Sequence, residues 1–317
     1  MPDSNTPLLN RRKVVKIAQE TTIGTAIAAG SATVLPFALT DIKCVPDDFT
    51  ADGDRMLQGN YLGSYPNIIG VKTGTVSFKM EWHAQLNETA LMTTLLNSCG
   101  FSDYSSGVGY SLRHTLGDME TCTLYVYEDG RLKGIRGAMG SFNLSAENGK
   151  RFYLEFEFKG SWINPVDAAL PTVDPTNSAT APVVAKTCTL DWGGGTAVGS
   201  FPQVANFSLD LAAEVNPRQA MSDDNGVQNF YVEEFDPSIT LDPEARLVAG
   251  FDAYGIYSGA TLTDVNLICT IPGTTSTKTL AFGDCQVVGI GDDERDKKLV
   301  DSLTLKPVEP GEIFLDL

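Results

Sequence analysis

Two stretches of this chain alternate apolar and polar side chains with a period of two. In one, Val76 to Trp82, and in the other, Phe152 to Phe158, every second side chain is large and apolar. This period belongs to a β-strand with one buried face, because successive strand side chains point to opposite sides. Asn148-Gly149 just before the second run predicts a hairpin whose two turn residues both have positive φ.

Further strands and one helix are predicted in the first half. Short strands are expected at 14–18, followed by a Gly/Ala-rich loop, and at 122–127 and 131–136, which are separated by a turn at 128–130. Asn87 can cap a helix whose apolar residues recur every three or four positions up to Cys99, and Gly100 supplies the stop.

Residues 163–186 interrupt this pattern and divide the chain. Four prolines lie among Ala, Thr, Ser and Asp there, which is typical of an extended linker. We therefore predict domains at 1–162 and 187–317, with an N-terminal arm and a long loop at 41–69 in the first.

The second half has the same predicted order of elements. Asp242 and Pro243 predict the start of a helix that carries Leu247, Val248, Phe251 and Tyr254. The strands around it are expected at 188–192, 207–211, 265–271, 279–282, 285–290 and 299–305, with a turn at 291–296. This agreement favours two copies of one fold over a second, unrelated β domain.

The charge of the chain argues against a nucleic-acid-binding groove. There are 40 acidic and 23 basic residues, giving a net charge of −17. Such a surface repels phosphates instead of releasing their counterions. Repulsion would suit a wall past which DNA slides, although charge alone does not establish that use.

Residue patterns for catalysis or metal binding are weak. Gly193-Gly194-Gly195 has no following Lys-Ser/Thr, and the calcium-like loop starting at Asp48 has Gly59 where a bidentate Glu is required. Glu155 and Glu157 share a strand face, as an acid/base pair would, but a solvated face explains them. The six cysteines are interpreted as free core thiols, and His83 and His114 as structural or solvated. We expect no enzyme activity, cofactor or metal.

The N-terminal region allows a second interpretation. Arg11-Arg12 followed by the apolar stretch 26–37 resembles a twin-arginine export signal, although Gln19 to Thr22 intervene and Gly30, Ser31 and Thr33 break the stretch. No run reaches the roughly 18 apolar residues that span a bilayer. Export would fit an adhesin or carbohydrate-binding surface protein built from two β-sandwiches.

Several ordered segments resemble the major tail tube protein of long-tailed, non-contractile bacteriophages. They are GVKTGTVSFKMEW at 70–82, LLNSCGF at 95–101, LKGIRGAMGSFNLSAENGK at 132–150, LEFEFKG at 154–160, AALPT at 168–172, FSLDL at 207–211, VNPR at 215–218 and DPSITLDPE at 236–244. The resemblance covers most of residues 12–307. It implies a mainly β chain with two tandem tail-tube-type β-sandwich domains, each with one flanking helix.

The resemblance also implies a function. Stacked rings of such a protein form the virion's tail tube, through which DNA passes without specific binding, after subunits have assembled in the host cytoplasm. Expected partners are other copies of the chain and the tape measure, tail terminator and distal tail proteins. Two copies of the fold per chain favour a homotrimeric ring with pseudo-six-fold symmetry over a homohexamer.

Two sets of residues are expected to serve this assembly. The lumen candidates are acidic residues on the polar strand faces, partly offset by Lys79 and Lys159: Glu81, Glu155, Glu157 and Asp210. The candidates for contact between stacked rings are apolar residues of the long loop: Tyr61, Leu62, Tyr65 and Ile68.

Overall fold

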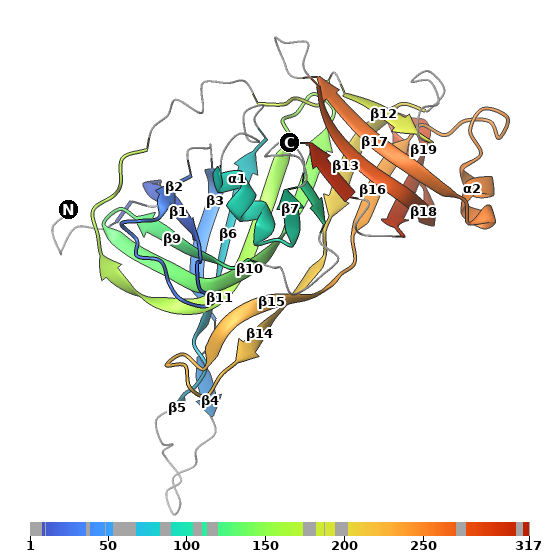
Figure 1. The fold of residues 1–317 in the computed structure, drawn as a ribbon. Helices are drawn as coiled ribbons and strands as arrows, with labels where there is room; N and C mark the ends of the chain where they lie inside the picture. The colour runs from blue at the N-terminus through green and yellow to red at the C-terminus, as the bar shows by residue number, and fades with distance from the viewer. Residues whose placement is uncertain are drawn as a thin grey trace, which may run out of the picture.

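A computed structural model gives the fold of the chain (Figure 1). It describes residues 8–9, 11–35, 39–47, 49–52, 68–82, 90–103, 110–112, 120–173, 182–186, 188–193, 202–270, 277–308 and 313–316. The described chain is mainly β, with large antiparallel sheets and two short helices. This confirms the predicted mainly β class. Neither described helix has the length and apolarity to cross a bilayer.

The described residues of the first half form one helix and eleven strands. These are β1 (Lys13–Gln19), β2 (Thr33–Val34), β3 (Leu39–Pro46), β4 (Thr50–Asp52), β5 (Ile68–Ile69), β6 (Thr73–Glu81), α1 (Ala90–Asn97), β7 (Phe101–Asp103), β8 (Tyr110–Leu112), β9 (Cys122–Glu128), β10 (Arg131–Glu147) and β11 (Tyr153–Asp167). The strands predicted from periodicity in this half are confirmed, and Gly100 ends the first helix with φ of 89°.

In the second half, the part of the chain that the structure describes forms the other helix and nine strands. These are β12 (Cys188–Trp192), β13 (Val204–Asp210), β14 (Ala213–Gln219), β15 (Val227–Phe235), β16 (Ser238–Pro243), α2 (Ala253–Gly259), β17 (Leu262–Thr270), β18 (Thr277–Arg295), β19 (Lys298–Pro307) and β20 (Ile313–Asp316). The two strands predicted at 279–282 and 285–290 are one long strand, β18.

The same order of strand pairings occurs in both halves. In the first half the neighbours run β1, β9, β10, β11, β6, β3, and in the second they run β12, β17, β18, β19, β16, β13. Every pair is antiparallel. A hairpin is inserted at the same place in each half: β4–β5 between β3 and β6, and β14–β15 between β13 and β16. Both hairpins lie at the lower end of the molecule in Figure 1.

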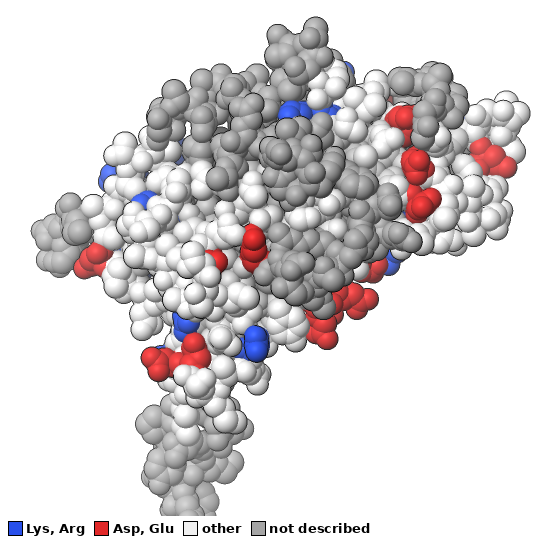
Figure 2. All heavy atoms as spheres, in the orientation of Figure 1, with Lys and Arg blue, Asp and Glu red and all other residues white. Residues whose placement is uncertain are grey.

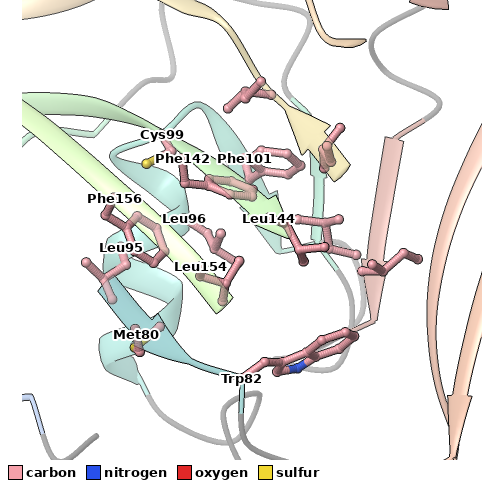
Figure 3. Packing of buried hydrophobic residues seen from close by; sticks show 14 of the residues in the cluster. Met80, Trp82, Leu95, Leu96, Cys99, Phe101, Phe142, Leu144, Leu154 and Phe156 are labelled. Atoms are coloured by element: carbon pink, nitrogen blue, oxygen red, sulfur yellow. The ribbon is translucent and has the colours of Figure 1, made fainter. Parts of the chain in front are cut away.

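Two strand pairs join the halves into one sheet system. The end of β10 pairs with β13, and β20 pairs with β8 as well as with β18. The largest buried cluster accordingly contains residues of both halves. In the first half, Leu95 and Leu96 of α1 face Met80, Leu154 and Phe156 of the sheet (Figure 3).

The turns differ from the sequence prediction in one respect. Asn148-Gly149 does connect β10 to β11, but only Gly149 has positive φ (78°), and the last paired residues, Ser145 and Tyr153, enclose a longer loop. Asn148 N–H donates to the Ala205 carbonyl at 2.8 Å, so a contact with the second half shapes this loop.

The two-residue turns with positive φ at both positions occur elsewhere. They are Asp129-Gly130, between β9 and β10, and Asp296-Lys297, between β18 and β19. Residues 291–295, predicted as part of a turn, belong instead to β18.

The start of the second helix was predicted wrongly. Asp242 and Pro243 end β16, and the helix begins at Ala253 with Asp252 as its N-cap, whose Oδ1 accepts a hydrogen bond from Gly255 N–H at 2.7 Å. Asp242 Oδ1 accepts hydrogen bonds from the backbone N–H groups of Ala205 and Asn206. Its carboxylate is therefore committed to the sheet and cannot cap a helix.

The predicted linker is structured at both ends. Residues 163–167 belong to β11, and Val183 is buried, with its N–H donating to the Trp82 carbonyl at 2.8 Å. Residues 174–181 lie outside the described residues. The two-domain division of the chain stays a prediction.

The β14–β15 hairpin of the second half packs on the first half. Arg136 of β10 donates two hydrogen bonds to the Asp223 carboxylate at 2.8 Å, and Asn225 Nδ2 donates to the Trp162 carbonyl at 2.8 Å. Met139 of β10 shares a buried cluster with Val227, Phe230 and Val232 of the hairpin. Polar and apolar contacts together fix the hairpin to β10 and β11.

Candidate functional site: a two-sided sheet of eight strands

Eight strands from both halves form one continuous antiparallel sheet. Their order is β3, β6, β11, β10, β13, β16, β19, β18, with β10–β13 as the junction between halves. One row of directly opposed residues crosses all eight strands, namely Leu39, Met80, Leu154, Leu144, Leu209, Ile239, Leu305 and Val287. Leu39 is partly buried and the other seven are buried.

The next rows on either side carry polar residues that face the other way. One row is Thr40, Lys79, Glu155, Asn143, Asp210 and Ser238, and the other is Glu81, Tyr153, Ser145, Ser208, Thr240, Thr304 and Gly289. Asn143, Ser145, Ser208 and Thr240 are exposed. The sheet thus has a buried apolar face and a polar face that runs unbroken across both halves; we call the latter the polar face.

All four acidic candidates lie on the polar face. Glu155, Glu157 and Asp210 are exposed, whereas Glu81 is half-buried. Glu81 forms an ion pair with Arg151, and Glu155 forms one with Lys79. Glu157 lies opposite Ser77 and Ser141, and it has no ion pair among the described residues. The structure therefore brings the four together but neutralises two of them.

A shallow cavity of about 210 Å³ marks the middle of this face. It is lined by the polar residues Ser141, Asn143, Glu155, Glu157, Lys159 and Asp210 and by neighbouring apolar groups that include Val215. Three carboxylates and one ammonium make this area acidic. More acidic than basic surface is also visible on the face of the molecule in Figure 2, in keeping with the net charge of −17.

The two outer strands of the sheet, β3 and β18, each have a stretch along one side that pairs with no described strand. β3 pairs with β6 alone, and residues 287–295 of β18 pair with β19 alone. Tyr254 of α2 lies beside β18, where its hydroxyl donates to Asp292 Oδ1 at 2.7 Å. A strand edge without a neighbouring strand presents backbone donors and acceptors, so the sheet can be extended at both ends once these groups are free of other partners.

Of the residues expected to contact a neighbouring ring, only Ile68 can be placed. It lies in β5 with 45% of its surface exposed, next to Ile69, which is 58% exposed. Tyr61, Leu62 and Tyr65 lie outside the described residues. Val71, also exposed, lies near Gly226 in the turn of the β14–β15 hairpin.

The cysteines are free thiols, as predicted. Five of them are buried, and burial raises the pKa of Cys44, Cys122 and Cys285 to about 12 each, so these thiols stay protonated at neutral pH. No group of three potential metal ligands occurs among the described residues. His83 and His114 lie outside them.

A second, larger cavity of about 500 Å³ lies where the end of β10 meets the second half. Phe152, Lys186, Asn206, Phe207, Glu244 and Arg295 are among the residues lining it. Both phenylalanines are buried, so its accessible groups are mainly the charged and polar ones, a setting for a small polar ligand.

Sequence reasoning missed most of the polar face. Ser145, Ser208, Thr240 and Thr304 were not singled out, although each alternates with buried apolar neighbours in its strand. That alternation was the available signal for the face. Which strands lie side by side depends on pairings between distant segments, and no local pattern gives these.

Comparison with known proteins does not identify the chain. No protein-family model matches its sequence, and no curated protein matches it significantly.

Proposed function

We propose that the chain is a non-enzymatic structural subunit that polymerises into stacked rings, forming the tail tube through which a long-tailed phage ejects its DNA. The observation that carries this proposal is the β10–β13 junction. There, one half of the chain extends the sheet of the other while both faces stay in register across eight strands. A sheet that already joins two similar units edge to edge can join further units in the same way.

The repeated pairings indicate how the next unit would join. β18 holds in the second half the place that β10 holds in the first, and β3 corresponds likewise to β13. We infer that the chain contains two copies of one fold and that β18 of one copy of the chain pairs with β3 of the next. Three chains would then close a pseudo-six-fold ring, with the polar face lining the lumen.

The chemistry of the polar face suits a conduit for DNA. Its carboxylates repel phosphates, and its Ser, Thr and Asn side chains offer weak, uncharged contacts, so the face does not hold the polymer in place. Within this proposal the subunit assembles in the host cytoplasm and resides in the virion. The ends of the tube meet the tail terminator and distal tail proteins, and the tape measure protein fills it before ejection.

The larger cavity favours a second candidate function, that of a surface adhesin or carbohydrate-binding protein. Lys186, Asn206, Glu244 and Arg295 line that cavity and offer hydrogen-bond donors and acceptors to the hydroxyl groups of a sugar. Such a protein would act without polymerising, and it would bind glycans through this cavity.

Electron microscopy of the purified full-length protein tests the proposal and separates the candidates. Three chains of 34.0 kDa give a ring of about 102 kDa and six give about 204 kDa. We expect tubes built from rings of three chains, with β18 of each chain next to β3 of its neighbour. Rings with true six-fold symmetry would overturn the trimer. A folded protein that forms no polymer and binds a glycan array would favour the adhesin.

A further inference from the structure

The outer edge of β3 is covered by two lysine side chains. Lys13 Nζ donates to the Ile42 carbonyl at 2.9 Å, and Lys133 Nζ donates to the Cys44 carbonyl at 3.3 Å. Lys13 comes from β1 and Lys133 from β10. Neither strand is a sheet neighbour of β3, so these bonds are side-chain caps on its backbone.

The Cys44 carbonyl points away from β6, while Ile42 lies in an irregularity of the β3–β6 pairing. Asp47 N–H donates to the Thr73 carbonyl, and Val45 and Lys43 lie opposite Thr75 and Ser77. Antiparallel residues alternate between bonding inward and outward, so Cys44 directs its backbone groups to the free side of β3. Pro46 faces the same side and has no N–H to offer.

At the junction inside the chain, the equivalent groups are paired with a strand. Leu209 of β13 lies between residues that bond β16 and directs its own backbone groups to β10, just as Cys44 does on the open side of β3. The backbone groups of β13 that bond to the neighbouring strand β10 thus have counterparts in β3, and these counterparts bond to ammonium groups.

Both lysines also contact the carboxylate of Glu128, which remains their partner when their bonds to the carbonyls break. Glu128 lies 2.8 Å from Lys133 Nζ and 3.4 Å from Lys13 Nζ, and both lysine side chains are largely buried. An ammonium has three N–H donors, so each lysine can hold the carboxylate and a carbonyl together. Breaking the bond to a carbonyl therefore costs one hydrogen bond, and the ammonium group stays paired with the carboxylate.

We propose that Lys13 and Lys133 guard the β3 edge of the free subunit, and that β18 of a second copy displaces them during assembly. This inference rests on the proposed function and adds a regulatory step to it. An uncovered edge strand pairs indiscriminately with other chains. The guard keeps single subunits apart until the matching strand supplies several backbone hydrogen bonds at once.

The experiment measures the protein concentration above which polymers form, by light scattering and sedimentation, for the full-length chain. The test variant combines Lys13→Met and Lys133→Met, which keep the aliphatic stems and remove the donors. The matched control is Lys16→Met, because Lys16 also lies in β1 and donates to a backbone carbonyl, that of Ala29, away from β3. We expect the threshold to fall about tenfold in the test variant, because two hydrogen bonds no longer have to break before the strands pair, and to stay unchanged in the control.

The possible outcomes distinguish an error in the proposed role of the two lysines from an error in the proposed function. If the wild type polymerises and the double variant has the same threshold, the guard is wrong and the proposed function stands. If both are folded and neither polymerises, the proposed function is wrong and the guard with it. Should the double variant fail to fold, Lys133→Met alone and the Lys13→Arg/Lys133→Arg pair replace it. We then expect a lower polymerisation threshold for Lys133→Met. The arginine pair keeps its hydrogen-bond donors and should have the wild-type threshold.

Discussion

Asn143 of β10 and Asp210 of β13 lie directly opposite each other on the polar face, where the two halves of the chain join. When the Asn143 amide is oriented with its nitrogen toward Asp210, Nδ2 donates to Asp210 Oδ1 at 2.7 Å. This side-chain contact joins the halves on the exposed side of the sheet, above the buried pair of Leu144 and Leu209.

Asn143→Asp should weaken this junction. It places two carboxylates opposite each other, so the free energy of unfolding in urea should fall by roughly 1 kcal/mol at pH 7. Ser145→Asp is the control, since Ser145 lies opposite Ser208 on the same strand pair. Equal losses in both variants would show that the Asn143 contact adds nothing to the junction.

Reversing the charge of the polar face should slow DNA ejection without preventing tube formation. The variant is Glu157→Lys with Asp210→Lys, because both carboxylates are exposed and Glu157 has no ion pair among the described residues. Lysines there would bind phosphates, and raising the salt from 0.1 M to 1 M should restore the rate as the Debye length falls from about 10 Å to about 3 Å.

The measurement is the rate of genome release from phage particles carrying the variant. Glu234→Lys is the control, because Glu234 is exposed in the β14–β15 hairpin and outside the polar rows. Normal ejection at low salt by particles with the lysine pair would mean that the polar face does not line the lumen.

Two aspartates near the second helix should differ in their effect on stability. Asp252→Ala removes an N-cap and should cost about 1 kcal/mol of unfolding free energy. Asp242→Ala should cost more, because it leaves two backbone N–H groups of β13 without their acceptor and removes the ion pair with Arg295. Urea denaturation of the two variants gives the comparison. A larger loss for Asp252→Ala would refute the assigned roles.

The contact between Arg136 and Asp223 should make stability depend on pH. Burial raises the pKa of Asp223, but hydrogen bonds from Arg136 and the Asn225 N–H outweigh it, so the pKa lies below its ordinary value of 3.8. A carboxyl whose pKa is lowered by folding stabilises the fold above its unfolded pKa and loses that contribution as the pH falls through the folded one.

Asp223→Asn isolates this contribution. The wild type should exceed the variant in unfolding free energy by a constant amount from pH 7 to about pH 5, and the difference should shrink below about pH 4. Urea titrations at a series of pH values measure it. A difference that is constant down to pH 3 would contradict the prediction.

The exposed isoleucines of β5 should serve the stacking of rings. Ile68→Ser with Ile69→Ser removes two apolar side chains, exposed by 45% and 58%, that a neighbouring ring would cover. We expect single rings or short stacks in electron micrographs instead of long tubes. Val166→Ser, which changes a similarly exposed residue at the end of β11, is the control. Full-length tubes from the isoleucine variant would exclude β5 from the contact between rings.

Local patterns predicted local structure in this chain and little else. β6 and β11 follow from their alternation because the side-chain period of a strand is contained in a few consecutive residues. Asp242-Pro243 carries a helix-start pattern but forms no helix, since Asp242 bonds Ala205, 37 positions away, and Arg295, 53 positions away. The joining of β10 to β13 and the capping of β3 depend on distant residues in the same way.

The pairing of β20 with β8 has a consequence for how the protein is made. Leu315 lies opposite Tyr110, and both are buried, so a strand near the end of the chain completes a sheet begun more than 200 residues earlier. A ribosome that has synthesised only the first half holds a nascent chain whose β8 edge is unpaired. An unpaired edge promotes aggregation, and this one stays unpaired until residues 313–316 have left the ribosome. The time needed to translate the second half therefore sets how long this edge stays unpaired.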